Sequence, residues 1–356
     1  MDRLLVVGAG ATIEECIRSG NLPNDPKSLF PSIKNFCAKF FQPMSSSLFY
    51  ATASYLIANE IPFDKKFLNM PLDGEKLSHS MQILNIKDGD KVTDEDLANG
   101  PIGTFVKMEK ENPRIYNIER LCEFAWNSVG ADNAFWRDFV YSGIYDKLQW
   151  LFYYQFGSGL GKPMLAGTKV ANQLDNYDGV INLNYDIAFD LALKQAGKNI
   201  CYAPHFKENA IYVLKPHGSI NLYMNYKTKK WFFAEPDKVA GSVSLDLGNE
   251  GIFDPFESII PPRLNKNYKL HPMAKAILHS IRTYKSNKLT FWGIGLTESD
   301  VDLLEIYREA SSTAKVVEFI NPDESACAKA SSLLDREVKW FASLGEWLEQ
   351  FGVSYP

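Results

Sequence analysis

Four short polar or glycine-bearing stretches each adjoin an apolar run of this sequence, and their chemistry depends on whether they meet. They are Gly8–Thr12, Asn182–Asp190, His217–Ser219 and Gly293–Asp300. In a parallel sheet, the residues that follow the strands gather at one carboxyl edge, and ligands bind there. We therefore expect the four stretches to form a single site.

Three side chains in these stretches suit catalysis. The amide of Asn184 donates and accepts hydrogen bonds, so it can orient a water or a sugar hydroxyl, although turns also favour asparagine. The imidazole of His217 titrates near neutral pH and suits a base acting on a ribose hydroxyl or a water. A hydrogen-bonded loop histidine is the alternative for His217, and a helix N-cap is the alternative for Asp186.

Two glycine turns suit an anionic ligand. Gly8-Ala9-Gly10 follows Leu4–Val7, and Gly293-Ile294-Gly295 follows Lys288–Trp292. Backbone N–H groups in such turns approach phosphates closely, so two turns at one edge suit a diphosphate-bearing dinucleotide. Because no third glycine follows at the dinucleotide spacing, an ordinary tight turn is the alternative. The residues predicted to bind the ligand are Gly8, Ala9, Gly10, Thr12, Gly218, Ser219, Gly293, Gly295, Thr297, Ser299 and Asn321.

Strands alternate with helices over most of the chain, which predicts an α/β fold with a Rossmann-like, doubly wound parallel sheet. The predicted strands are Leu4–Val7, Gly179–Leu183, Ala210–Leu214, Lys288–Trp292, Lys315–Ile320 and Glu337–Phe341, with a hairpin formed by Ile220–Tyr226 and Lys230–Ala234. Residues 21–165 lack this alternation and are predicted as a large helical insertion, with helices at Lys27–Phe41, Ser45–Ile61, Ile118–Val129 and Asn133–Tyr154. Residues 1–20 and 166–356 then form the core domain, in which Ile13–Arg18 and Val170–Leu174 are predicted to be helical.

The composition narrows the possible partners and reactions. The net charge is −5, so no global basic field favours nucleic acid. The five cysteines are scattered and no two have metal-ligand spacing, so we expect reduced thiols, a cytoplasmic location and no metal. The sequence contains no apolar run of about 20 residues for a membrane span. It also contains neither a Gly-Lys-Ser/Thr phosphate loop nor a Gly-x-Ser-x-Gly nucleophile turn.

Five of these motifs, in the same order, resemble those of the sirtuin family, whose members bind NAD on a Rossmann-like sheet. Gly8–Thr12 is similar to the opening turn of the family, Asn184–Asp186 to its Asn-x-Asp motif, His217–Ser219 to its His-Gly motif, Gly293–Ser299 to its later phosphate turn and Asn321 to its ribose-contacting Ile-Asn pair. The zinc module and the Phe-Arg loop of sirtuin deacylases have no counterpart here. The Asn-Tyr-Asp form with a helical insertion looks more like the NAD-hydrolysing sirtuin-like domains of bacterial antiphage defence.

The resemblance implies cleavage of NAD to nicotinamide and ADP-ribose without a metal. Asn184 would position the attacking water, His217 would hydrogen-bond the ribose hydroxyls, and Asp186 would orient Asn184 or favour the developing cation. Because an unrestrained NAD hydrolase would be toxic, we expect a homo-oligomer or a partner protein, such as a hexameric helicase-type ATPase or a phage-sensing protein, to restrain it. The alternatives are a sirtuin-type protein deacylase or ADP-ribosyltransferase, and a non-catalytic sensor of NAD or ADP-ribose.

Overall fold

The computed structural model of the chain describes residues 2–18, 95, 163–225, 227–240, 251, 258–260, 266, 268, 272–283, 285–296 and 300–355. Apart from Glu95, they belong to one compact unit, which consists of Met1–Asn24, Leu148–Ile260 and Lys266–Pro356. The predicted helical insertion lies outside the described residues except for Glu95 and residues 163–165. Its four helices, and the boundaries of the two predicted domains, therefore stay predictions.

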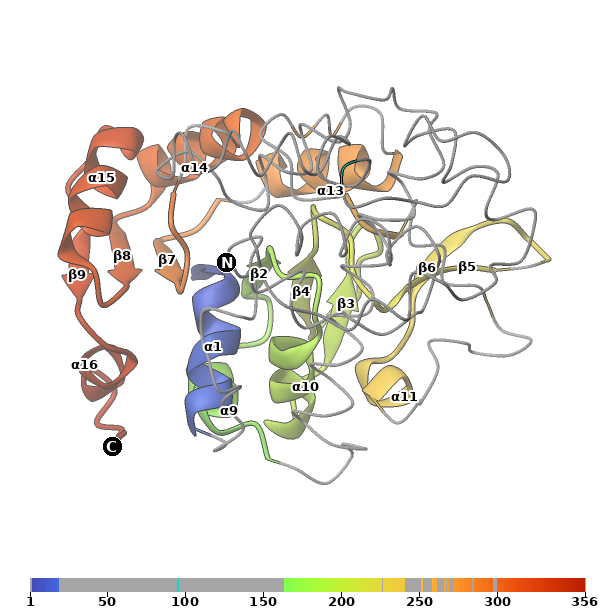
Figure 1. Cartoon of the computed structure of the whole chain (residues 1–356), viewed down its shortest axis with the longest axis horizontal. Helices are drawn as coiled ribbons and strands as arrows, with labels where there is room; N and C mark the ends of the chain where they lie inside the picture. Colours follow the sequence, from blue (N-terminus) through green and yellow to red (C-terminus); the bar gives the residue numbers. More distant parts are fainter. Residues whose placement is uncertain are drawn as a thin grey trace. The chain divides into compact units, whose positions relative to one another are not determined.

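Seven parallel strands form one sheet in the order β3-β4-β2-β1-β7-β8-β9 (Figure 1). The strands are β1 (Arg3–Val7), β2 (Gly179–Asn182), β3 (Ile200–Tyr202), β4 (Ile211–Leu214), β7 (Lys288–Trp292), β8 (Val316–Ile320) and β9 (Lys339–Phe341). From the central strand β1, the chain adds β2, then the edge strand β3 and then β4 between those two, and it later adds β7, β8 and β9 in turn on the other side of β1. The predicted Rossmann-like α/β fold is confirmed.

Two groups of helices cover the sheet, one on each face (Figure 1). The first group is α1 (Ala9–Arg18), α9 (Leu165–Ala171) and α10 (Ala188–Gln195), and the second is α13 (Pro272–Thr283), α14 (Val301–Thr313) and α15 (Glu324–Leu334). The described unit also contains α11 (Pro236–Ala240), α16 (Leu344–Glu349) and the antiparallel hairpin of β5 (Leu222–Met224) and β6 (Trp231–Phe233). The predicted hairpin is thus confirmed.

The central strands form because their side chains are apolar on both faces. In β1, the four residues Leu4–Val7 are fully buried, and so are Val180 and Ile181 in β2. Strands covered by helices on both sides have continuous apolar runs of this kind. The core of the unit therefore surrounds β1, β2 and β7, the strands that carry three of the four predicted site stretches.

The structure differs from the local predictions at three places. Strand β3 was not predicted, because it has only three residues and gives no periodic signal in the sequence. Helix α1 begins at Ala9, whereas Ile13 was expected, so the glycine turn itself is the first turn of the helix. Helix α9 begins at Leu165, whereas Val170 was expected, because the carboxylate of Glu15 accepts the backbone N–H groups of Leu165 and Gly167 at 2.5 and 2.7 Å. A distant partner thus supplies the N-terminal hydrogen bonds that a local cap usually provides.

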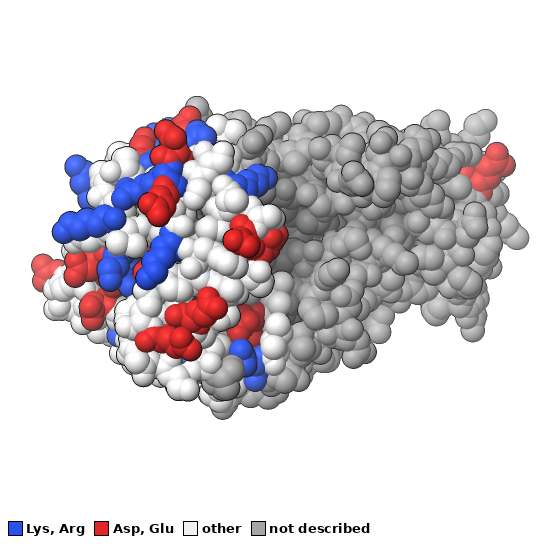
Figure 2. Space-filling view, turned by 90° about the vertical axis from the view of Figure 1, so that its left-hand side faces the viewer, with Lys and Arg blue, Asp and Glu red and all other residues white. Residues whose placement is uncertain are grey.

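The described surface around α14 and α15 carries both signs of charge. Exposed acidic and basic side chains follow one another there, among them Glu305, Arg308, Glu309 and Lys315. Figure 2 shows the same mixture over the described part of the face that it views. Separately, none of the described helices is long and apolar enough to cross a membrane.

Candidate functional site

The carboxyl ends of four neighbouring strands lie in register. Val7 pairs with Asn182 on one side and with Trp292 on the other, and Trp292 pairs with Ile320. The next residue of each strand, which begins a predicted motif, therefore lies at the same edge of the sheet. This is also where the direction of chain building reverses beside β1, the usual ligand position in open α/β sheets.

The amide of Asn184 is fixed by two hydrogen bonds. Its Nδ2 atom lies 2.9 Å from the carbonyl oxygen of Gly8 and 3.0 Å from Oγ1 of Thr12. A carbonyl oxygen can only accept, so the NH2 group must face Gly8. Both of its hydrogens are then used, and Oδ1 accepts from none of the described residues. Asn184 can thus offer Oδ1 to the hydroxyl of a ligand or to a water.

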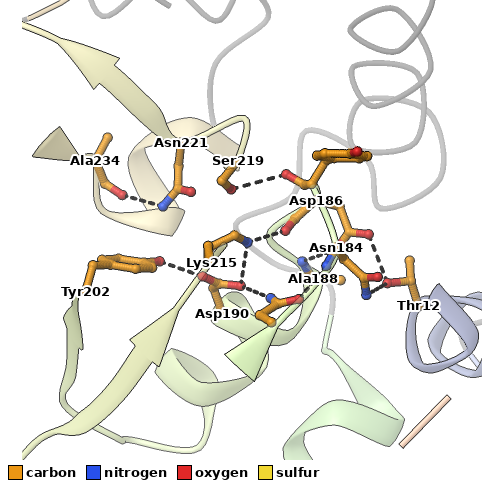
Figure 3. A network of polar contacts seen from close by, with 12 residues as sticks. Thr12, Asn184, Asp186, Ala188, Asp190, Tyr202, Lys215, Ser219, Asn221 and Ala234 are labelled. Atoms are coloured by element: carbon orange, nitrogen blue, oxygen red, sulfur yellow. Dashed lines mark hydrogen bonds and ion pairs between the residues drawn. The ribbon is translucent and has the colours of Figure 1, made fainter. Parts of the chain in front are cut away.

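Thr12 connects Asn184 to Asp186 (Figure 3). The Thr12 hydroxyl donates to Oδ2 of Asp186 at 2.9 Å and accepts from Asn184. The other oxygen of Asp186 accepts the backbone N–H of Ala188 at 3.0 Å, at the start of α10. The N-cap-like role of Asp186 and its orienting role are therefore combined in one buried carboxylate. Its burial raises the pKa, while Lys215 opposes the shift.

His217 is hydrogen-bonded to Leu183, the residue that precedes Asn184. Its Nδ1 atom lies 2.9 Å from the carbonyl oxygen of Leu183, so Nδ1 must carry the proton. Nε2 is then an acceptor, and the hydroxyl of Tyr268 lies 2.8 Å from it. Burial lowers the pKa of His217 to about 4, and Lys266 adds to this shift while Asp300 opposes it. At neutral pH the imidazole is uncharged, and Nε2 can accept a hydrogen bond.

A buried ion pair between Lys215 and Asp190, which was not predicted from the sequence, packs against the loop that carries Asp186 (Figure 3). Lys215 is fully buried, and its Nζ atom donates to the carbonyl oxygen of Asp186 at 2.6 Å and lies 3.4 Å from Oδ2 of Asp190. Asp190 also accepts from Asn182 at 2.8 Å and from Tyr202 at 2.7 Å. The adjacency of Lys215 to the His-Gly motif was the only signal available, because its partner lies 25 residues earlier.

The two glycine turns pack on each other. The N–H of Gly8 donates to the carbonyl of Trp292 at 3.0 Å, and the N–H of Gly10 donates to that of Gly293 at 2.8 Å. A Cβ atom on Gly8 or Gly10 would come within 2.7 Å of Gly293, and one on Gly293, whose φ is +64°, within 2.2 Å of Ala11. These three glycines are therefore required by contact between the turns. The N–H groups of Gly8 and Gly10 are used inside the protein rather than aimed at a phosphate.

Gly218 and Ser219 likewise serve the local structure. Gly218 has a φ of +80°, and a Cβ atom there would lie 2.1 Å from the carbonyl oxygen of Ser258. Ser219 is fully buried and its hydroxyl donates to the carbonyl of Tyr185 at 3.1 Å. These contacts position His217 and Asn184. Direct contact of Gly218 or Ser219 with a ligand stays a prediction.

Gly295 differs from the other glycines of the two turns. It is exposed, and a Cβ atom on it would meet no described atom within 4 Å. Gly295 lines a recess of about 250 Å³, open solvent included, together with Leu183, Ile294, Leu296, Asp300, Leu303, Leu304 and Tyr307. The recess thus adjoins Leu183, whose carbonyl holds His217.

The remaining predicted ligand contacts divide into two groups. Asn321 donates to the carbonyl of Ile294 at 3.1 Å and accepts the N–H of Asp323 at 2.9 Å, so its amide supports the second glycine turn. Thr297 and Ser299 lie outside the described residues. Among the residues that are described, no group of three or more His, Cys, Asp or Glu side chains could hold a metal ion.

Comparisons with known proteins find similar chains among the solved structures. No family model matches the sequence, and no curated protein matches it. A solved structure described as a complex of a Sir2 homolog with NAD has a TM-score of 0.35 and 14% identity to this chain, over 67% of this chain and 78% of the other.

Proposed function

We propose that this protein cleaves the nicotinamide–ribose bond of NAD with water, releasing nicotinamide and ADP-ribose. One observation carries the proposal: the oriented amide of Asn184 and an imidazole held by the preceding residue, Leu183, lie at the edge of a Rossmann-like sheet where ligands usually bind. Asn184 is held by Gly8 and Thr12, and His217 by Leu183. The order of these motifs along the chain, similar to that of the sirtuin family, supports NAD as the ligand.

Asn184 is assigned to the water. Cleavage builds positive charge on the ribose, and the attacking oxygen must be in place as the bond breaks. Because both amide hydrogens are committed, Oδ1 can accept a hydrogen bond from the water. This bond directs a lone pair of the water oxygen at the anomeric carbon. Thr12 and Asp186 contribute by preventing the amide from turning.

His217 is assigned to the ribose hydroxyls. Its Nε2 lone pair can accept a hydrogen bond from a hydroxyl, and its low pKa keeps that lone pair unprotonated throughout the neutral range. The buried carboxylate of Asp186, which is linked to Asn184 through Thr12, favours the developing cation. Since Gly8 and Gly10 are occupied with Gly293, we assign the diphosphate to the backbone of the exposed Gly295.

By the same resemblance, we propose that the activity serves bacterial antiphage defence in the cytoplasm. The hydrolase would be restrained by self-assembly or by a partner protein and would deplete NAD when that restraint is released. An isolated monomer that already works at full rate would contradict the restraint and leave the chemistry intact.

Nicotinamide release from NAD, followed by chromatography with the purified chain, tests the chemistry. Asn184→Ala and His217→Ala should each lower the rate at least about 100-fold, since each removes a group assigned to the reaction. Exposed residues of the same types provide matched controls: Asn176→Ala and His279→Ala should leave the rate unchanged.

The same assay separates the alternatives. Release that requires an acyl-lysine peptide would indicate a deacylase, and transfer of labelled ADP-ribose to protein would indicate a transferase. Binding of NAD by calorimetry without any release would indicate a sensor. A chain that neither binds nor cleaves NAD, or an Asn184→Ala protein with native activity, would refute the assignment.

A further inference from the structure

A tyrosine blocks the atom through which His217 would act. Tyr268 is only 1% exposed, and its hydroxyl lies 2.8 Å from Nε2 of His217, with the two rings stacked at 17°. Because Nδ1 donates to Leu183, Nε2 is the only nitrogen of this imidazole that can accept a hydrogen bond. Any ligand hydroxyl that is to reach this lone pair must therefore compete with the phenol.

The phenol has a second acceptor within reach. Oδ1 of Asp300 lies 3.3 Å from the Tyr268 hydroxyl and accepts from Nζ of Lys266 at 2.6 Å. A tyrosine hydroxyl has one proton, so Tyr268 can donate to His217 or to Asp300 but not fully to both. The proton changes acceptor by a rotation of the hydroxyl, whereas the phenol oxygen leaves Nε2 only if the ring shifts toward Asp300.

Asp300, the second acceptor for the Tyr268 proton, also lines the recess beside Gly295. It precedes α14 as the N-cap residue, yet its side chain accepts no capping hydrogen bond. Its side chain is 21% exposed and lines the same recess as Gly295 and Leu183. Lys266, whose side chain is 3% exposed, holds the carboxylate in place. The acceptor that competes with His217 is therefore partly exposed, at the recess that Gly295 also lines.

We propose that Tyr268 is a hydrogen-bond switch and a positioning residue of the site. With its proton on Nε2, His217 is capped; with its proton on Asp300 and its oxygen shifted toward that carboxylate, the Nε2 lone pair is open to a ribose hydroxyl. This inference rests on the proposed NAD function for the identity of the hydroxyl, but the switch itself is a property of four side chains: His217, Tyr268, Asp300 and Lys266.

Two substitutions should shift the switch in opposite directions. Tyr268→Phe removes the competing proton and leaves the ring, so Nε2 is permanently open. Asp300→Asn replaces a carboxylate by an amide oxygen, which is a weaker acceptor, so the phenol stays on Nε2. We expect ADP-ribose, which has the ribose hydroxyls but no nicotinamide bond to cleave, to bind about 2- to 10-fold more tightly to the first variant and about 2- to 10-fold more weakly to the second, the effect of one neutral hydrogen bond.

The double variant identifies the route of the effect. If Asp300 acts through Tyr268, then Asp300→Asn should have no effect on ADP-ribose affinity once Tyr268 is phenylalanine. A direct contact between Asp300 and the ligand would instead leave the loss intact in the double variant. That result, or weaker or unchanged binding by Tyr268→Phe, would overturn the switch.

A ligand-free measurement separates this inference from the proposed function. The chain has five histidines, so the side-chain ¹⁵N resonances of His217 can be assigned by comparison with a His217→Asn protein. The Nε2 resonance should move toward that of a free lone pair in Tyr268→Phe and in the opposite direction in Asp300→Asn. It should not move in Tyr177→Phe, an exposed tyrosine whose hydroxyl donates to Asn209. If ADP-ribose binds to none of the proteins, the NAD assignment fails and these resonances alone decide the switch; unchanged resonances would overturn it.

Discussion

Replacing Thr12 with valine removes a single hydroxyl and nearly keeps the shape of the side chain. In the native protein this hydroxyl donates to the buried carboxylate of Asp186 at 2.9 Å and accepts from Asn184 at 3.0 Å. In the variant, Asp186 keeps its bond from Ala188, and Asn184 keeps its bond to Gly8. The amide is then held by one bond instead of two and is free to rotate about it.

The magnitude follows from the two lost bonds. A hydrogen bond to a charged group contributes about 1.5–3 kcal/mol and a neutral one about 0.5–1.5 kcal/mol, so we expect unfolding to become easier by about 2–4 kcal/mol. A misdirected Asn184 affects the reaction rather than the binding of NAD. We therefore expect kcat to fall about 10- to 100-fold, which corresponds to about 1.4–2.7 kcal/mol of activation free energy.

Steady-state kinetics of nicotinamide release, with Thr12→Ser as the control, test this reasoning. Serine retains the hydroxyl and should keep kcat within a few-fold of the native value. KM for NAD should change little in either variant, because Thr12 faces two side chains of the protein. If Thr12→Val instead raised KM and left kcat unchanged, Thr12 would contact the ligand directly, as the sequence alone suggested, and the orienting role would be refuted.

Three further predictions test other parts of the site. Gly295→Ala should change stability by less than about 0.5 kcal/mol yet raise KM for NAD, whereas Gly293→Ala, which brings a Cβ atom to 2.2 Å from a backbone nitrogen, should cost about 3 kcal/mol or more in urea unfolding. His217 has a folded-state pKa of about 4 against an ordinary 6.5, so the unfolded chain binds the extra proton between these values and stability rises with pH across that window. The free energy of unfolding, measured at about pH 4 and pH 7, should therefore fall on acidification by about 3 kcal/mol more in the native protein than in His217→Asn. An equal fall in the two proteins would refute the uncharged histidine. Lys215→Met should destabilise the protein by about 3–5 kcal/mol because it leaves Asp190 buried without its counter-ion, and adding Asp190→Asn should recover part of that loss in the same urea titration; additive losses would contradict the pairing.

The sequence by itself determined the class of fold and the edge of the sheet at which the motifs meet. The apolar runs of β1, β2, β4, β7 and β8 are local signals, because a strand buried on both faces needs apolar residues throughout. Once the strands are parallel, the residues that follow them must lie together. Asn184, His217 and the two glycine turns could therefore be placed at one edge from the sequence.

Only the tertiary structure decided what each of these residues contacts. Gly8 and Gly10 suggested phosphate binding, but their N–H groups are used by Trp292 and Gly293, more than 280 positions away. Thr12 suggested a ligand contact, but its hydroxyl joins Asn184 to Asp186. Tyr268 gave no signal, Lys215 gave only its place beside the His-Gly motif, and Asp300 gave only its place at the end of the last predicted stretch. Apolar periodicity is repeated over many residues and can be read locally, whereas a hydrogen bond between distant residues depends on a single pair of atoms that only the folded chain brings within 3 Å.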